Sequence, residues 1–299
     1  MNPKKTNRIA KHVIYGSVGL LVILLLFLIG YILITGLPGM SWHFLTSVSQ
    51  SFEAGGGIRD QIFNSVCILI LTTLISFPIA LGVGIYLAEY AKDNWFTNLL
   101  RTTIELLSSL PSIVVGLFGY LLFVIKFQIG FSIISGAITL TFFNLPLLTR
   151  SIEDAFRAVP LDQRQAGVAL GISKWKTIMG IVFPCALPKI LTGVILSAGR
   201  IFGEAAALIF TAGQSNSVID YANWNPFSPT SPLNILRPAE TLAVHIWKVN
   251  TESILPDAHQ VSSGSAAVLI IVILIFNFGA RWLGNVVYRK LTATDKERS

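Results

Sequence analysis

Two ionisable residues lie inside an apolar segment, where charged side chains are costly. Arg200 and Glu204 fall within the run at 186–212, and Arg200 would lie ~18 Å along a helix that begins near Pro188. Each charge at the centre of a membrane helix costs roughly 2.5–3.5 kcal/mol. Because the two residues are four apart, we expect their side chains to meet on one helix face. Two interpretations stay open: a buried ion pair that fixes helix packing, or the lining of a water-filled path in which the arginine donates to an oxyanion.

The second candidate site is a polar and basic stretch at 150–188, which separates two long apolar runs. Its cations, counting the residue that follows it, are Arg150, Arg157, Arg164, Lys174, Lys176 and Lys189. The sequence predicts two short helices, 162–170 and 173–180, with Gly171 free to adopt the turn between them. A plain connection between helices needs only ~2–8 residues. We therefore interpret the stretch as an element that docks on a partner, as an amphipathic helix does in a groove.

Signatures of an enzyme are absent from the sequence. The four histidines lack the spacing of a metal site, and no G-x-x-x-x-G-K-[ST] phosphate loop occurs. We therefore expect no catalytic activity, no cofactor and no bound metal. If the protein uses ATP, another chain must bind the nucleotide.

The elements that position these residues follow from the composition. Hydrophobic residues make up 53% of the 299-residue chain and charged residues 12%, whereas an average soluble domain is roughly a quarter charged. Apolar runs of at least ~18 residues indicate membrane-spanning helices, because only helices or closed barrels satisfy the backbone in lipid. The sequence contains six such runs, at 13–37, 62–88, 104–127, 130–149, 186–212 and 265–287. We predict an all-α polytopic membrane protein with six transmembrane helices.

The distribution of positive charge predicts the orientation. Cytoplasmic loops retain lysine and arginine, and seventeen of the 22 such residues fall at the N-terminus, in the segments 89–103 and 150–189, or in the tail. Both termini are therefore expected in the cytoplasm. This asymmetry accounts for the net charge of +7, so the charge needs no nucleic-acid partner. The first apolar run is too long for the ~7–15-residue core of a signal peptide, and we expect an uncleaved anchor.

These boundaries divide the chain into three regions. Residues 1–60 form the basic N-terminal segment, the first transmembrane helix and an extracytoplasmic loop. Residues 61–288 form the main transmembrane domain, with a cytoplasmic loop at 150–188 and an extracytoplasmic loop at 213–264. Residues 289–299 form a charged cytoplasmic tail.

The basic stretch contains a spacing that is typical of one class of membrane proteins. Gln165, Ala166 and Gly167 are followed after three residues by Gly171, and after nine more by Ile-Val-Phe and Pro184. This pattern resembles the EAA loop of ABC-importer permeases, which reads Glu-Ala-Ala, three residues, Gly, nine residues, Ile-x-Leu-Pro. The spacing, the glycine and the proline match. Glutamine replaces the usual glutamate, glycine the second alanine and phenylalanine the leucine, so the loop keeps the family's shape without its acidic residue.

Four further stretches match one family more closely. They are PSIVVGLFG at 111–119, SAGRIFGEAAALIFTAG at 197–213, HIWKVNTE at 245–252 and GSAAVLIIVILIFN at 264–277. Together they resemble the PstA-type permeases of phosphate ABC importers. The resemblance implies a MetI-like fold in the bacterial cell membrane and the import of inorganic phosphate. It also implies that Arg200 and Glu204 act in the translocation path. The positions that it assigns to contact with an ATPase are Gln165, Ala166, Gly167, Gly171 and Pro184.

The same resemblance implies partners. They are a second permease of PstC type, an ABC ATPase dimer and an extracytoplasmic phosphate-binding protein, all in or at the lipid bilayer. ATPase movement would reach the fifth span through the segment 162–176, because only 184–188 separates the loop from that span. Three alternatives stay open: a permease for sulfate or molybdate, an ion-driven secondary transporter, and a scaffold or sensor without transport. The EAA spacing argues against the second, and the buried Arg200 and Glu204 argue against the third.

Overall fold

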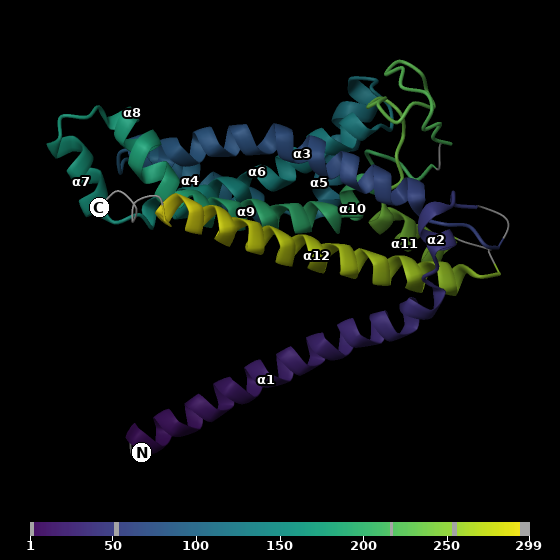
Figure 1. Ribbon diagram of the computed structural model, residues 1–299, viewed down its shortest axis with the longest axis horizontal. Helices are drawn as coiled ribbons and strands as arrows, with labels where there is room; N and C mark the ends of the chain where they lie inside the picture. The colour runs from purple at the N-terminus through teal and green to yellow at the C-terminus, as the bar shows by residue number, and fades with distance from the viewer. Residues whose placement is uncertain (1–2, 51–53, 216–217, 253–255, 294–299) are drawn as a thin grey trace.

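The computed structural model describes residues 3–50, 54–215, 218–252 and 256–293 (Figure 1). Helices joined by turns and loops make up these ranges, and no strand occurs in them, which confirms the predicted all-α class. In chain order the elements are α1 (Pro3–Gly36), η1 (Leu37–Gly39), α2 (Trp42–Thr46), α3 (Arg59–Ile85), η2 (Tyr86–Tyr90), α4 (Trp95–Ser108), α5 (Ser112–Gly119), η3 (Tyr120–Lys126), α6 (Ile133–Arg157), α7 (Leu161–Ala169), α8 (Lys174–Thr177), η4 (Ile178–Val182), α9 (Phe183–Phe202), α10 (Ala206–Ile209), α11 (Leu242–Glu252) and α12 (Ala258–Ala293).

Five helical segments of the described chain are long and apolar enough to cross a membrane, and one bent pair of helices brings the number to six. The five are Ala10–Gly39, Arg59–Tyr90, Ile133–Arg157, Lys174–Phe202 and Ala258–Gly279, and the pair is Trp95–Ser108 with Ser112–Lys126. The short π-helical segments η2 and η4 continue α3 and lead into α9 without a break. The chain therefore has the spans of a polytopic membrane protein.

The third predicted span is not one helix. α4 and α5 meet at an angle of 96°, so the expected continuous helix at 104–127 is wrong. Pro111 caps α5 in an extended conformation, with ψ of 136°. Proline has no N–H to continue a helix, and its ring disfavours helical geometry in the preceding Leu110. The side chain of Ser109 closes α4 by donating to the Leu106 carbonyl at 2.7 Å.

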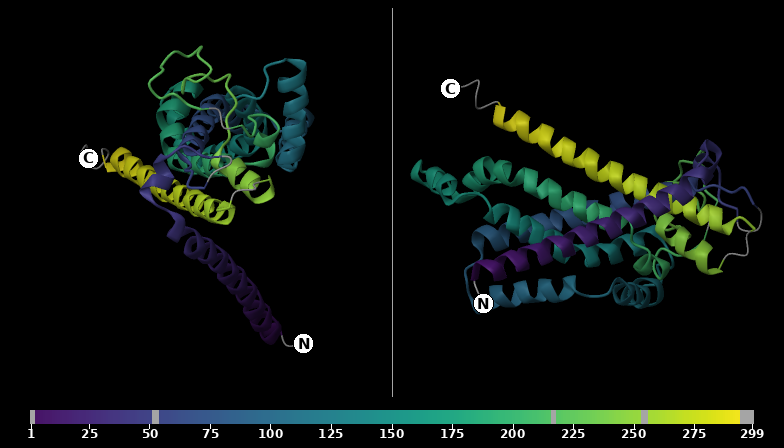
Figure 2. Two further views of the ribbon diagram at one scale, coloured as in Figure 1. Left: turned by 90° about the vertical axis from the view of Figure 1, so that its right-hand side faces the viewer. Right: turned by 90° about the horizontal axis from the view of Figure 1, so that it is seen from below.

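The centre of the molecule is a bundle in which α3 packs on α6, α6 on α9, and α9 on α12 (Figure 2). Apolar side chains fill most of it, and one polar link crosses it. Asn144 of α6, 1% exposed, accepts a hydrogen bond from Ser197 Oγ of α9 at 2.7 Å. Its amide nitrogen lies 3.5 Å from Ser76 Oγ of α3. Three spans are thus joined by one buried side chain.

The bundle has two different ends. α7 and α8 project from one, which we call the α7 end, and α2 and α11 lie at the other, the α11 end (Figure 1). The start of α1 and the finish of α12 both lie toward the α7 end (Figure 1). α1 lies apart from the bundle along most of its length and meets α12 only near its C-terminal residue Gly36, and its most apolar window has no buried residue. Of the predicted tail at 289–299, residues 294–299 lie outside the described residues.

Candidate functional site

The basic stretch folds, as predicted, into two short helices joined at a glycine. α7 ends at Ala169, and α8 begins at Lys174 and runs through η4 into α9. Gly171 has a φ of +71°, a left-handed conformation that glycine adopts without the steric cost of a side chain. The N–H groups of Leu170 and Ile172 donate to α7 carbonyls at 3.2 and 3.1 Å. The turn is therefore closed by its own backbone.

The predicted EAA-loop residues do not form one cluster. Gln165 and Ala166 are exposed on α7, whereas Gly167 is buried. A Cβ at Gly167 would lie 2.5 Å from Cγ2 of Thr177 in α8, so the two helices approach too closely for any side chain there. Pro184 lies in the first turn of α9 and is half-buried. Gln165 and Ala166 are available to a partner, and Gly167 instead allows α7 to pack on α8.

Large apolar side chains are exposed around this turn. Leu161 is 65% exposed, Leu170 77% and Trp175 55%. Exposed apolar side chains that cluster with polar neighbours mark an interaction surface. We call Leu161, Gln165, Ala166, Leu170 and Trp175 the tip residues. They belong to the part of the molecule that projects from the bundle (Figure 1).

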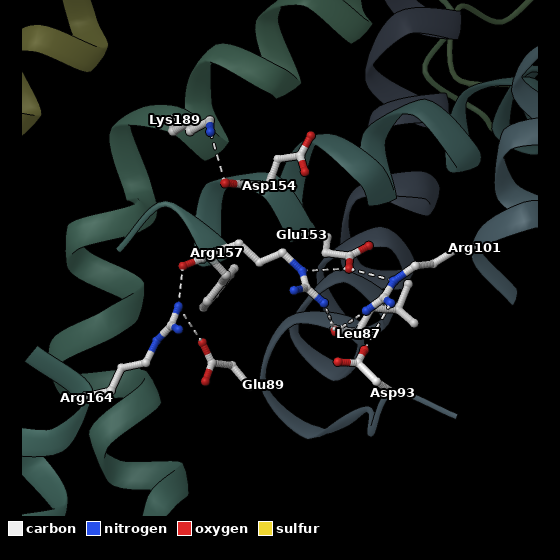
Figure 3. Close-up of polar contacts among 10 residues, drawn as sticks. Leu87, Glu89, Asp93, Arg101, Glu153, Asp154, Arg157, Arg164 and Lys189 are labelled. Atoms are coloured by element: carbon white, nitrogen blue, oxygen red, sulfur yellow. Dashed lines mark hydrogen bonds and ion pairs between the residues drawn. The ribbon is translucent and has the colours of Figure 1, made fainter. Parts of the chain in front are cut away.

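Arg164 of α7 pairs with Glu89 of η2 rather than facing outward (Figure 3). Its Nη2 lies 3.2 Å from Glu89 Oε1 and donates to the carbonyl of Phe156 at 2.5 Å. The side chains of Arg164 and Glu89 are 21% and 7% exposed. Lys174 donates to the Glu89 carbonyl, and its ammonium lies 4.5 Å from the centroid of the Tyr90 ring. Both α7 and α8 are thus held on the last turn of the α3 span.

A second cluster centres on Glu153 of α6 (Figure 3). Glu153 Oε1 accepts from Arg157 Nε at 2.9 Å and from Arg101 Nε at 3.2 Å. Both guanidinium groups also donate to the Leu87 carbonyl in η2, at 3.2 and 3.5 Å. Hydrogen bonds between charged groups are stronger than neutral ones. This cluster ties α4, α6 and η2 together beside the Arg164–Glu89 pair.

The cations of the basic stretch therefore make mainly internal contacts. A further one, Arg150, pairs with Glu105 of α4 on the exposed surface. The sequence analysis used these cations to assign the side of the membrane and did not find their acceptors. The available signal was the set of acids at the ends of neighbouring spans, Glu89, Glu105 and Glu153.

Arg200 and Glu204 do not share a helix face. α9 ends at Phe202, and a separate helix, α10, follows. The Glu204 carboxylate lies at the start of α10, where its Oε1 accepts from the Ala207 N–H at 3.2 Å. The predicted pairing at a spacing of four residues is wrong, because the helix expected over 186–212 ends between the two residues.

Arg200 lies in the last turn of α9 and stacks on α6. Its guanidinium carbon is 3.8 Å from the centroid of the Phe143 ring, which is a cation–π contact. Stacking uses the face of the guanidinium plane and leaves the N–H donors at its edge. The residue is half-buried, so part of its side chain remains accessible.

A buried polar cluster at the α11 end was not found from the sequence. Glu240 is fully buried, and its carboxylate contacts Gln61 Nε2 at 3.1 Å, His245 Nδ1 at 3.3 Å and Lys248 Nζ at 3.5 Å. These groups belong to α3, α11 and the segment before α11. In the described ranges, no group of three or more histidine, cysteine, aspartate and glutamate side chains is arranged to hold a metal ion. The cluster fixes α11 on the bundle.

Two more contacts hold the long loop before α11 against α3. Arg237, 2% exposed, donates to Asn64 Oδ1 at 2.7 Å, and burial lowers the pKa of this guanidinium. The Tyr221 hydroxyl donates to Asp60 Oδ1 at 2.9 Å. Burial and that hydrogen bond raise the pKa of Tyr221 above its usual value.

The apolar spans and the glycine-jointed helical pair at one end are the features of a class of membrane transport subunits. The chain belongs to the family described as "Binding-protein-dependent transport system inner membrane component", whose pattern matches residues 80–293. Members of this family are permease subunits of ABC transporters. The chain is therefore a transport permease and not an enzyme.

Individual relatives agree with this assignment. The chain is 52% identical to the "Probable ABC transporter permease protein YqgI" of Bacillus subtilis (strain 168), over 98% of this chain and 100% of that protein. It is 32% identical to the "Phosphate transport system permease protein PstA" of Xylella fastidiosa (strain 9a5c), over 83% and 82% of the two chains. The resemblance to PstA-type permeases is thus confirmed.

A solved structure supports the fold alone. A chain of the bacterial alginate ABC transporter in complex with alginate pentasaccharide-bound periplasmic protein matches with a TM-score of 0.66 at 12% identity, over 95% of this chain and 96% of that one. The predicted MetI-like permease fold is confirmed by this likeness together with the family match.

Proposed function

We propose that this protein is a membrane-spanning subunit of an ATP-driven importer of inorganic phosphate. It forms the translocation path with a second permease of PstC type, and it is coupled to a separate ATPase dimer. An extracytoplasmic binding protein delivers phosphate to the pair. The observation that carries this proposal is the similarity, over most of the chain, to proteins named as phosphate transport permeases. The name of the Bacillus subtilis relative leaves the substrate open.

The proposed orientation places the α7 end in the cytoplasm. The segments rich in lysine and arginine gather at that end, as cytoplasmic segments do. Both ends of the described chain also lie toward it (Figure 1). In this orientation residues 1–60 form the anchor and first outer loop, 61–288 the permease domain, and 289–299 the cytoplasmic tail.

The tip residues at the α7 end are the proposed contact with the ATPase. Gln165 and Ala166 are exposed among apolar side chains, so they can enter a groove on a partner. Gly171 and Gly167 act indirectly, since one sets the turn and the other lets α7 pack on α8. Pro184 lies farther along, in α9, where it continues the same rigid segment into the span.

The proposed translocation path passes Arg200 and Glu204. An unbroken helical segment runs from Lys174 to Phe202, so movement of α8 reaches the turn of α9 that carries Arg200. The guanidinium edge is a donor set suited to a phosphate oxyanion. Glu204 lies where α9 gives way to α10, and we propose that its negative charge limits how tightly the anion is held.

The test of substrate is uptake of labelled phosphate by cells or proteoliposomes that contain the whole importer. Unlabelled phosphate in excess is expected to abolish the signal, whereas equal concentrations of sulfate or molybdate leave it unchanged. Loss of the signal with sulfate or molybdate would move the assignment to another oxyanion. Uptake that persists without the ATPase but collapses with the ion gradient would identify a secondary transporter instead.

A further inference from the structure

We propose that Arg164 and Glu89 form a positioning contact through which movement of α7 reaches the α3 span. This inference rests on the proposed function, because it concerns how ATPase movement enters the membrane bundle. The covalent chain offers a route from α7 through α8 to α9. The ion pair between Arg164 and Glu89 adds a second route, from α7 directly to η2 (Figure 3).

Burial distinguishes this ion pair from the Arg150–Glu105 pair at the same end. The side chain of Glu89 is 7% exposed and that of Arg164 21% exposed. By contrast, the two partners of the Arg150–Glu105 pair at the same end are 53% and 58% exposed. Exposed pairs contribute little, whereas removing one partner of a buried pair leaves a charge without compensation. The Arg164–Glu89 contact is therefore the stronger constraint.

Three further contacts lie beside the Arg164–Glu89 pair. The Arg164 guanidinium also donates to the Phe156 carbonyl in the last turn of α6. On the other side of the turn, Lys174 donates to the Glu89 carbonyl and lies over the ring of Tyr90. The contacts thus join α7 and α8 to both α3 and α6. If the tip residues move, either these contacts break or the α3 and α6 spans move with them.

The backbone alone would not transmit such movement. α7 is joined to α8 through a turn in which Gly171 takes a positive φ, and to α6 through a short segment that contains Pro160. Neither connection is a continuous helix, so the backbone alone does not hold α7 rigidly against α6 and α8. The side-chain contact with Glu89 limits the movement of α7 relative to the bundle. Its segment, η2, is a π-helical turn, a feature that often marks functional sites in helices.

The contact also has room to rearrange. The ion pair has a single point of contact, between Arg164 Nη2 and Glu89 Oε1. Neither Arg164 Nε nor Glu89 Oε1, both buried, forms a hydrogen bond. A small rotation of α7 can bring Nε onto the carboxylate and form a two-point contact of the kind arginine favours. Two arrangements of similar contacts are what a switching element requires.

From η2 the movement has a defined continuation. The Leu87 carbonyl accepts from Arg101 of α4 and Arg157 of α6, and both arginines meet at Glu153. Displacement of η2 therefore also moves α4 and α6, through these hydrogen bonds, as well as α3. Arg164 thereby couples α7 to three spans at once.

The test compares Arg164→Gln with Arg150→Gln in the complete importer. In proteoliposomes, we expect Arg164→Gln to hydrolyse ATP normally but to import at least about fivefold less substrate per ATP, the lower end of typical coupling effects. Arg150→Gln removes a cation from an exposed pair at the same end and should match the wild type. Arg164→Lys, which keeps the charge, should recover part of the loss, and Glu89→Gln should reproduce the loss.

A second readout does not depend on the substrate. The variant Lys92→Cys, two residues beyond η2, is made in a chain that also carries Cys67→Ser and Cys185→Ser. Its labelling rate should change when ATP is added, and this change should be lost in Arg164→Gln but kept in Arg150→Gln.

The outcomes separate the inference from the function on which it rests. Equal import per ATP in Arg164→Gln and Arg150→Gln, or an unchanged nucleotide response at position 92, overturns the positioning role. If Arg164→Gln fails to assemble, the same comparison is made with Arg164→Lys and Glu89→Gln, and normal coupling in both overturns it. A wild-type importer that responds to ATP but carries no phosphate refutes the proposed substrate and leaves the positioning role standing.

Discussion

At the scale of single residues, Arg200 shows how an apolar segment can hold a charge without an acidic partner beside it. Its guanidinium rests on the Phe143 ring, and this stacking offsets part of the cost of removing the charge from water. The carboxylate of Glu204 is used to cap the next helix. The two charges are therefore independent in this arrangement, and each can be tested alone.

Replacing Arg200 with glutamine is expected to reduce phosphate uptake by about tenfold or more, because a hydrogen bond to a charged group contributes about 1.5–3 kcal/mol. The measurement is the initial rate of labelled phosphate uptake, with co-purification of the partner subunits as the check on assembly. Lys126→Gln, which removes an exposed cation from the end of η3, serves as the control and should transport normally. Normal uptake by an assembled Arg200→Gln complex would contradict the proposed role of this residue.

At the scale of elements, the sequence predicted most accurately the segments whose structure is determined by one or two neighbouring residues. Gly171 predicted the turn between α7 and α8, because glycine takes a positive φ without the steric cost of a side chain. Pro111 lies inside the apolar run at 104–127 that was predicted as one span, but it separates two helices that meet at 96°. The end of α9 was missed in the same way, since Gly203 at its C-cap lies inside the apolar run at 186–212 that was predicted as one helix.

Contacts between distant parts of the chain were beyond local signals. Arg164 and Glu89 meet only because η2, α6 and α7 converge in space (Figure 3). The sequence of a basic stretch does not reveal whether its cations face solvent or pair with acids that are distant along the chain. The family resemblance supplied the location of the candidate site, and the three-dimensional arrangement separated its exposed residues from its internal ones.

The packing of α7 on α8 leads to a test at Gly167. An alanine there would place its Cβ 2.5 Å from the Thr177 methyl group, and such overpacking typically costs about 1–3 kcal/mol. We expect Gly167→Ala to lower the apparent melting temperature of the purified protein. Adding Thr177→Ala removes the opposing atoms and should restore much of the loss. Ala166→Ser on the exposed side is the matched control, and equal melting temperatures for all variants would show that α7 does not pack closely on α8.

At the scale of the whole molecule, the two ends differ in how they are held together. The α7 end depends on ion pairs around Glu89 and Glu153 and carries exposed apolar side chains. The α11 end is closed by the fully buried Glu240 cluster and by Arg237. An ATP-driven importer needs one end that binds the ATPase and another that receives substrate. In the proposed orientation these are the α7 end and the α11 end.

Thiol labelling of intact cells tests that orientation. In the cysteine-free background, Lys92→Cys and Ser173→Cys are expected to react with a membrane-impermeant maleimide only after permeabilisation. Asn225→Cys, in the long loop before α11, should react in intact cells. All three positions are exposed, so accessibility to the reagent depends on the side of the membrane. The opposite pattern would place the α7 end outside and contradict the docking of an intracellular ATPase there.

The unbroken helical segment from Lys174 to Phe202 has a mechanical consequence. It is pinned within the bundle by the hydrogen bond between Ser197 and Asn144. Treated as a rod with its fulcrum at Ser197, it has one arm of about 35 Å toward Lys174 and one of about 7.5 Å toward Phe202, at 1.5 Å per residue. A wide swing outside the bundle then becomes a movement about fivefold smaller, and correspondingly more forceful, at Phe202, two residues beyond Arg200. Such leverage suits a gate that needs to shift by little more than the width of an ion.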